Sequence, residues 1–191
     1  MMLIGAIGYA LVISLMLRAD LRRLKDASLR FEVLLPVGLG LQLGASYLPG
    51  LDDLWIPGVW HLGAVLVLLT AFFNREYLGF NVIAAGVLLN AAVILVNWGM
   101  PVSPDALMYL GAHNLETQLA ASSPLYVLAD DATMLLWFAD VVPVPGPTPI
   151  RSVASIGDVL LMIGVVVLIL EMSGVVVRRQ PKQERGHVPL A

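Results

Sequence analysis

Apolar residues along the chain fall into five long runs, separated by short polar segments and by one long loop. The runs cover residues 1–17, 31–48, 59–73, 77–96 and 153–177. An α-helix needs about 17 to 25 mostly apolar residues to cross the hydrocarbon core of a bilayer. The pattern therefore predicts five transmembrane helices within one membrane domain, 1–177.

The loop 98–151 contains signals for structure of its own. Ser103-Pro104 and Ser123-Pro124 each place an N-cap residue before a proline at the first helical position. Two short surface helices are therefore expected, at 104–112 and 124–138. Four prolines between residues 141 and 149 exclude a helix there and predict an extended segment.

Composition supports a membrane location. Of the 191 residues, 59% are hydrophobic and 13% are charged, and the mean hydropathy is +0.85. A soluble domain usually carries about 25% charged residues. The expected fold class is an all-α polytopic membrane protein of about five transmembrane helices, with an extracytoplasmic cap made of short helices and a Pro-rich segment.

The positive charges predict an orientation. Ten of the eleven Lys and Arg residues lie in the loop 18–30, at Arg75 or in the tail 178–191. Five spans place these three segments on the same side of the membrane, and Lys and Arg concentrate on the cytoplasmic side. The N-terminus and the loop 98–151 are then extracytoplasmic, and the polar tail, which is expected to be disordered, is cytoplasmic.

The composition also excludes several kinds of chemistry. The chain has no cysteine, which excludes disulfides, thiolate metal sites and Cys nucleophiles. His61, His113 and His187 are scattered without metal-ligand spacing, so neither a metal nor a cofactor is expected. No basic cluster is large enough to predict nucleic-acid binding. The expected partner is membrane lipid, and a membrane protein partner or a homo-oligomer stays open.

Small and polar residues mark two of the predicted helices. Gly40 and Gly44 are four residues apart, a spacing that lets a neighbouring helix approach closely. Asn90 and Asn97 share a helix face that should look inward, because an amide in lipid would leave its donors unpaired. The two asparagines either make interhelical hydrogen bonds, worth about 0.6–2 kcal/mol each, or line a ligand site with Gly99.

Asp158 lies in the first turn of the run 153–177 and has two interpretations. Ser155 stands three residues before it and completes a helix-capping pattern with the aspartate at the third helical position. Alternatively, a partly desolvated carboxylate at a membrane entrance shares a proton with a second carboxylate and activates water. Asp140 is the candidate partner, so Asp140 and Asp158 are the candidate catalytic residues.

Glu171 lies near the other end of the same run, thirteen residues after Asp158. One interpretation is a salt bridge with Arg178, seven residues on, or with Arg75. The other is a relay for protons or ions, because ionisable groups inside a membrane are costly and often functional.

Three short segments together resemble a bacterial multi-span membrane family that is catalogued only as a domain of unknown function. They are NWGMPVS at 97–103, FADVVP at 138–143 and SIGDVL at 155–160. The resemblance covers most of the chain. It implies a multi-pass protein of the bacterial cytoplasmic membrane and brings no activity with it.

Asp140 and Asp158 also resemble the two aspartates of signal peptidase II, the lipoprotein-processing aspartic peptidase. There, too, one aspartate precedes an extracytoplasmic loop and the other opens the last span. Gly157 stands where that family has Ala before the second aspartate. Trp137 and Ser155 depart from it, since each replaces an Asn three residues before its aspartate.

The main functional hypothesis is a non-enzymatic membrane protein that binds a lipid, a small solute or a partner protein at a polar site on the outer face. The alternatives are an intramembrane aspartic peptidase that uses Asp140 and Asp158, and a small transporter. The two carboxylates distinguish the first two hypotheses. Carboxyls within hydrogen-bond reach, directly or through one water, favour the peptidase, and carboxyls turned apart and used for capping favour the binding protein.

Overall fold

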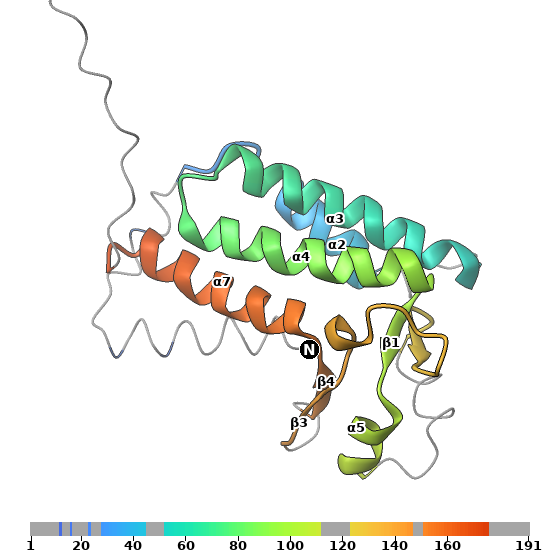
Figure 1. Ribbon diagram of the computed structural model, residues 1–191. Helices are drawn as coiled ribbons and strands as arrows, with labels where there is room; N and C mark the ends of the chain where they lie inside the picture. The colour runs from blue at the N-terminus through green and yellow to red at the C-terminus, as the bar shows by residue number, and fades with distance from the viewer. Residues whose placement is uncertain are drawn as a thin grey trace, which may run out of the picture.

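The computed structural model describes residues 28–44, 52–111, 123–146 and 151–175, together with Val12, Met16 and Arg23. The rest of the run 1–17 and the tail 178–191 lie outside the described residues. The described part is mostly helical, with five α-helices and four short strands (Figure 1).

Four helices make the body of the molecule, and each packs against the next in chain order (Figure 1). They are α2 (Leu34–Gly44), α3 (Ile56–Phe73), α4 (Leu78–Asn97) and α7 (Ile156–Met172). Among the described residues, two segments are long and apolar enough to cross a membrane, Asp53–Phe73 and Leu78–Asn97. They correspond to two of the five predicted spans. Within the described residues, α2 and α7 are shorter than the apolar runs that contain them, 31–48 and 153–177.

Asn74 ends α3 and ties together the end of the helices that lies away from the cap. Its buried amide donates from Nδ2 to Thr70 O at 2.8 Å and to Arg30 O at 2.9 Å, and Arg30 N donates to Asn74 Oδ1 at 2.9 Å. The Arg30 segment and the α3–α4 turn with Arg75 therefore lie at one end of the helices. The cap lies at the other end, so the arrangement is compatible with the predicted orientation.

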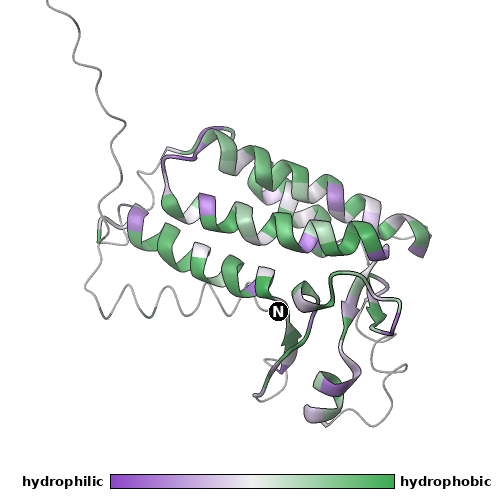
Figure 2. Ribbon diagram, viewed as in Figure 1, coloured by the Kyte–Doolittle hydropathy of each residue, from purple (hydrophilic) through white to green (hydrophobic). Residues whose placement is uncertain are grey.

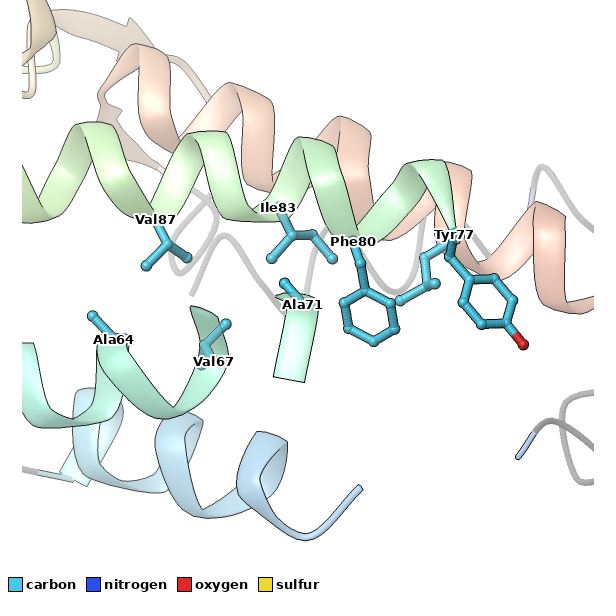
Figure 3. Packing of buried hydrophobic residues seen from close by; sticks show 8 residues of the cluster. Ala64, Val67, Ala71, Tyr77, Phe80, Ile83 and Val87 are labelled. Atoms are coloured by element: carbon cyan, nitrogen blue, oxygen red, sulfur yellow. The ribbon is translucent and has the colours of Figure 1, made fainter. Parts of the chain in front are cut away.

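The apolar core lies mainly between α3 and α4. Figure 3 shows side chains of α4 facing the small side chains of α3 across this contact. The most completely buried member is Phe80, and hydropathy colouring shows apolar residues along most of each helix (Figure 2). The cluster contains Ala64, Val67, Ala71, Tyr77, Phe80, Ile83, Val87 and Leu168.

Among the described residues, Gly40 and Gly44 do not form the predicted close helix contact. A Cβ added at either glycine has no atom of the described chain within 4 Å. The contact between α2 and α3 instead uses Gly38 and Gly63, where an added Cβ would lie 2.7 Å from Gly63 O and 2.5 Å from Gly38 O, respectively. A close approach to α3 therefore occurs, but α2 makes it through Gly38 and not through the predicted pair.

The most extensive helix contact among the described residues is between α4 and α7, and four glycines make it possible. A Cβ added at Gly79 would lie 2.5 Å from the backbone of Leu168, and one at Gly86 would lie 2.6 Å from Gly157 O. A Cβ at Gly164 would lie 2.8 Å from Ile83 N. We call Gly79, Gly86, Gly157 and Gly164 the glycine seam. It lets the two antiparallel backbones touch, as small residues do in membrane helix pairs.

The described part of the cap between α4 and α7 contains two short strand pairs, so the expectation of an all-α fold is wrong in this region. Parallel strands β1 and β2 pair, and antiparallel strands β3 and β4 pair. The extended segment expected near residues 141–149 contains β3. The cap elements are β1 (Met100–Val102), α5 (Pro104–Tyr109), β2 (Tyr126–Leu128), η4 (Leu136–Phe138), β3 (Val142–Val144) and β4 (Ser152–Ala154).

The two Ser-Pro signals in the cap have different outcomes. Ser103 caps α5 as predicted, accepting a hydrogen bond from Ala106 N. The predicted helix 124–138 is wrong, because Ser123 makes only a single turn and the next residues pair with β1 as strand β2. Asp130 then closes a local turn through Ala132 N and the hydroxyl of Thr133, the kind of side-chain bonding that competes with helix.

Candidate functional site

Asp140 lies where the two strand pairs of the cap meet. Its backbone N donates to Pro101 O at 3.0 Å, and its carbonyl accepts from Ser103 N at 2.8 Å, which fixes it against β1. The next residue, Val141, donates to Ala154 O in β4 at 3.2 Å. Because β4 runs directly into α7, this pairing brings Asp140 to the N-terminus of α7, where Asp158 lies.

Asp158 makes the capping box that the sequence predicted. Its backbone N donates to Ser155 Oγ at 2.9 Å, and its Oδ2 accepts from Ser155 N at 3.1 Å. The other carboxylate oxygen, Oδ1, accepts from Asn90 Nδ2 at 2.9 Å. Ser155 Oγ in turn donates to Asn90 Oδ1 at 2.9 Å. The three side chains form a closed network between α4 and α7, the polar network.

The polar network depends on a glycine. Asn90 is 5% exposed, and its amide oxygen occupies the space where a side chain at residue 157 would lie. Gly157 therefore admits the Asn90 side chain to the capping box. Ser155, which is fully buried, was expected only to cap the helix, and its bond to Asn90 was missed. Both helices have glycines seven residues apart, a pattern that could have revealed the seam and hence the network.

Asp140 differs from the polar network because its carboxyl is incompletely paired. It is 4% exposed, and its Oδ1 is buried without a hydrogen-bond partner. Burial raises the pKa of Asp140 well above its ordinary value of 3.8, and the charge of Asp158 raises it further. The environment thus favours the protonated form of Asp140 beside the Asp158 carboxylate.

The predicted ligand residues Asn97 and Gly99 lie nearer the cap than Asn90 does. Asn97 Nδ2 donates to Met134 O at 2.9 Å, and Met134 N donates to Asn97 Oδ1 at 2.9 Å, so the amide holds the cap loop from both sides. A Cβ added at Gly99 would lie 3.0 Å from Leu125 O. The structure thus gives the two asparagines different neighbours, and their role in ligand binding stays a prediction.

Trp98 is a further cap residue, and the sequence analysis did not predict its role. Its backbone is left-handed, with φ 52°, a conformation that is uncommon for a bulky residue. The indole Nε1 donates to Leu54 O at 3.0 Å, which ties the end of α4 to the turn before α3. The run Asn97-Trp98-Gly99 therefore fastens three separate segments around the end of α4.

Glu171 has partners that the sequence analysis did not predict. Its side chain is 8% exposed, and its two oxygens accept from Leu78 N at 2.9 Å and Gly79 N at 2.8 Å. Glu171 of α7 therefore caps the N-terminus of α4. Arg178 lies outside the described residues, so the predicted salt bridge is untested.

His61 bridges two helices. Its Nδ1 lies 2.7 Å from Pro57 O within α3, and its Nε2 lies 3.0 Å from Ala91 O in α4. Across the part of the chain that the structure describes, no three or more His, Cys, Asp or Glu side chains gather as metal ligands would. His61 therefore serves the packing of α3 on α4.

Comparison with known proteins gives one match. The Family of unknown function (DUF5317) matches residues 26–170, a stretch that contains α2, the cap, both aspartates and nearly all of α7. This match confirms the predicted resemblance to a family of unknown function, and the likeness to signal peptidase II stays a prediction. No curated protein and no solved structure matches the chain.

Proposed function

We propose a function from the geometry of this chain itself, because it belongs to the Family of unknown function (DUF5317) and the family brings no activity with it. The protein is an integral membrane protein that binds a lipid headgroup at Asp140, without catalysing a reaction. The single observation that carries this proposal is the buried Asp140 Oδ1 that has no hydrogen-bond partner.

The helices support the membrane location. Asp53–Phe73 and Leu78–Asn97 have the length and hydropathy of spans. Large apolar side chains are exposed along them, including Leu62, Phe72, Leu88 and Leu95, each at least 55% exposed. Lipid tails would cover this surface, whereas water would not tolerate so much of it on a monomer. We place the multi-span protein in the bacterial cytoplasmic membrane with the cap outside.

The ligand group follows from the charges at the site. A buried polar atom without a partner costs about 1–3 kcal/mol, so a hydrogen-bond donor is favoured next to Asp140. The Asp158 carboxylate repels an anion and attracts a cation. With Asp140 only 4% exposed, the incoming group has to be small. A primary ammonium meets all three requirements, and phosphatidylethanolamine carries one at the membrane surface.

Phosphatidylcholine provides a matched comparison, because its quaternary ammonium has the same charge but no N–H donor. The experiment is native mass spectrometry of the detergent-purified protein with each lipid at several concentrations. We expect the wild type to prefer phosphatidylethanolamine by about tenfold or more, since a hydrogen bond to a charged group is worth about 1.5–3 kcal/mol. Asp140→Leu should lose this preference.

The control is Asp131→Leu, which changes an exposed aspartate of the same cap. It should keep the preference of the wild type. Equal binding of the two lipids by the wild type would refute the proposal, and so would a preference that survives in Asp140→Leu. Thermal unfolding of each variant shows whether the fold is intact.

A second candidate, an aspartic hydrolase, is favoured by one observation. A carboxyl with a raised pKa faces a second carboxylate, which is the arrangement that separates an acid from a base. Against it, both oxygens of Asp158 already accept hydrogen bonds within the polar network. Cleavage of a lipoprotein precursor by the wild type, lost in both Asp140→Asn and Asp158→Asn at unchanged melting temperature, would favour the hydrolase. A wild type that cleaves no precursor would exclude that substrate class.

A further inference from the structure

Exposed apolar side chains gather around the end of α4 that carries the cap. They come from three segments: the turn before α3, the end of α4, and η4 with the loop that leads into it. Each is between 44% and 81% exposed, and Trp137 is the most exposed of them. We call this group the apolar rim: Leu54, Trp55, Trp98, Met134, Leu135 and Trp137.

The apolar rim is held in place by hydrogen bonds. The Asn97 side chain makes two hydrogen bonds of 2.9 Å to the backbone of Met134, and the Trp98 indole donates to Leu54 O at 3.0 Å. The short helix η4, which carries Trp137, packs against α4. Leu135 has a left-handed backbone with φ 55°, a conformation that is costly for leucine. The fold therefore holds a strained backbone at a residue whose side chain is exposed.

We propose that the apolar rim inserts into the lipid–water interface on the extracytoplasmic side of the membrane, so that the cap contacts the bilayer. The occupant of this surface is lipid, because exposed apolar residues of α4, such as Leu95 and Val96, lead directly into Trp98 of the rim. Tryptophan is the residue type that suits this boundary, since its ring is apolar and its N–H is polar. The inference rests on the proposal that α3 and α4 span the membrane.

Charges near the rim define how it inserts. The exposed side chains beside it are acidic, with Asp52 and Asp53 before α3 and Asp130 and Asp131 before Met134. Acidic residues gain nothing from anionic lipid, so insertion relies on burial of apolar surface. The depth of the rim should therefore be the same in phosphatidylcholine as in mixtures with anionic phosphatidylglycerol.

The test uses single cysteines, which suit a chain without native cysteine. A nitroxide label is placed at Trp137→Cys, Met134→Cys, Asp131→Cys or Leu88→Cys in the full chain, reconstituted into phosphatidylcholine vesicles. Spin relaxation is then measured with oxygen, which concentrates in lipid, and with a water-soluble nickel chelate. Met134→Cys keeps Trp137, so loss of the tryptophan anchor cannot decide the result.

We expect the labels at residues 134 and 137 to respond to oxygen more than to nickel, and the label at Asp131 to show the reverse. Labels at 134 and 137 that respond mainly to nickel, while Leu88 responds to oxygen, would overturn the inference and leave the spans intact. Protection of 134 and 137 from both reagents would indicate a protein partner and would also overturn it. A nickel response at Leu88 would instead refute the membrane proposal itself.

Discussion

At each end of the α4–α7 pair, a carboxylate caps the N-terminus of a helix. The two ends differ in whether a second, incompletely hydrogen-bonded carboxyl lies nearby. At one end, Glu171 accepts two backbone N–H groups at the start of α4. At the other, Asp158 accepts Ser155 N and the Asn90 amide at the start of α7. Among the residues that the structure describes, only the second end has a further carboxyl with a buried, unpartnered oxygen, which is Oδ1 of Asp140.

This difference separates structure from function within one helix pair. A carboxylate at a helix N-terminus is stabilising, because it meets unpaired N–H groups and the positive end of the helix dipole. Glu171 and Asp158 are both explained by this role. The buried Oδ1 of Asp140 makes no hydrogen bond that would stabilise the fold. This unpartnered oxygen is therefore the basis for proposing a ligand.

The largest expected effect comes from breaking the contact that both ends share. Gly86→Leu should destabilise the fold by about 3 kcal/mol or more, because the side chain would meet the backbone of Gly157. Gly40→Leu is the matched control and should change stability by less than about 0.5 kcal/mol or raise it slightly, since nothing lies within 4 Å of an added Cβ there. Thermal unfolding in detergent measures both, and equal melting temperatures would contradict the glycine seam.

The next effect tests the fully paired end. Glu171→Ala should cost about 2–4 kcal/mol, because it leaves the N–H groups of Leu78 and Gly79 without their acceptors. Glu171→Gln keeps one oxygen acceptor and should therefore lower the free energy of unfolding by less. A Glu171→Ala variant as stable as the wild type in a denaturation series would show that water replaces the carboxylate.

A smaller effect is expected at the other end. Asp158→Asn should cost about 1 kcal/mol, the usual value of capping and dipole interactions. Asn90→Ala combined with Asp158→Asn should cost less than the sum of the two single changes, because the residues share a hydrogen bond. Strict additivity in such a double-mutant cycle would separate Asn90 from the polar network.

The smallest effect is expected for Asp140→Asn at pH 3.5, and this effect should grow as the pH rises. The folded pKa of Asp140 is raised by burial and by Asp158. Any stability linked to this carboxyl is fully present below its unfolded pKa of about 3.9 and is lost as the pH rises through the folded pKa. The variant should therefore match the wild type within about 0.5 kcal/mol at pH 3.5 and exceed it at pH 8.5. A melting-temperature difference that is independent of pH would contradict the raised pKa.

Local sequence was sufficient wherever one segment decides its own structure. The apolar runs predicted α3 and α4 to within a few residues, and Ser155 with Asp158 predicted the capping box. The same reasoning failed for residues 124–138. Their Ser-Pro signal is real, but pairing with β1 stabilises a strand that the segment does not specify alone.

The sequence predicted which residues belong to the candidate site, but not which of them contact one another. Sequence singled out Asp140, Asp158 and Asn90, since carboxyls and amides in an apolar chain are costly to bury. The sequence did not reveal that Asn90 hydrogen-bonds to Asp158, whereas Asn97 hydrogen-bonds to Met134 in the cap loop. Those neighbours depend on the register of α4 against α7, which the glycine seam sets.

The sequence by itself determined that apolar helices form and where they begin, because hydropathy, prolines and capping residues act within a few residues of their own position. Among the described residues, tertiary structure alone decided that Gly38 and not Gly40 contacts a neighbouring helix, and that Asp140 comes near enough to Asp158 for their charges to interact. Both depend on contacts between segments far apart in the chain. The hydrogen bond from Val141 to Ala154 joins the strand that carries Asp140 to the strand that opens α7, and no local pattern encodes that pairing.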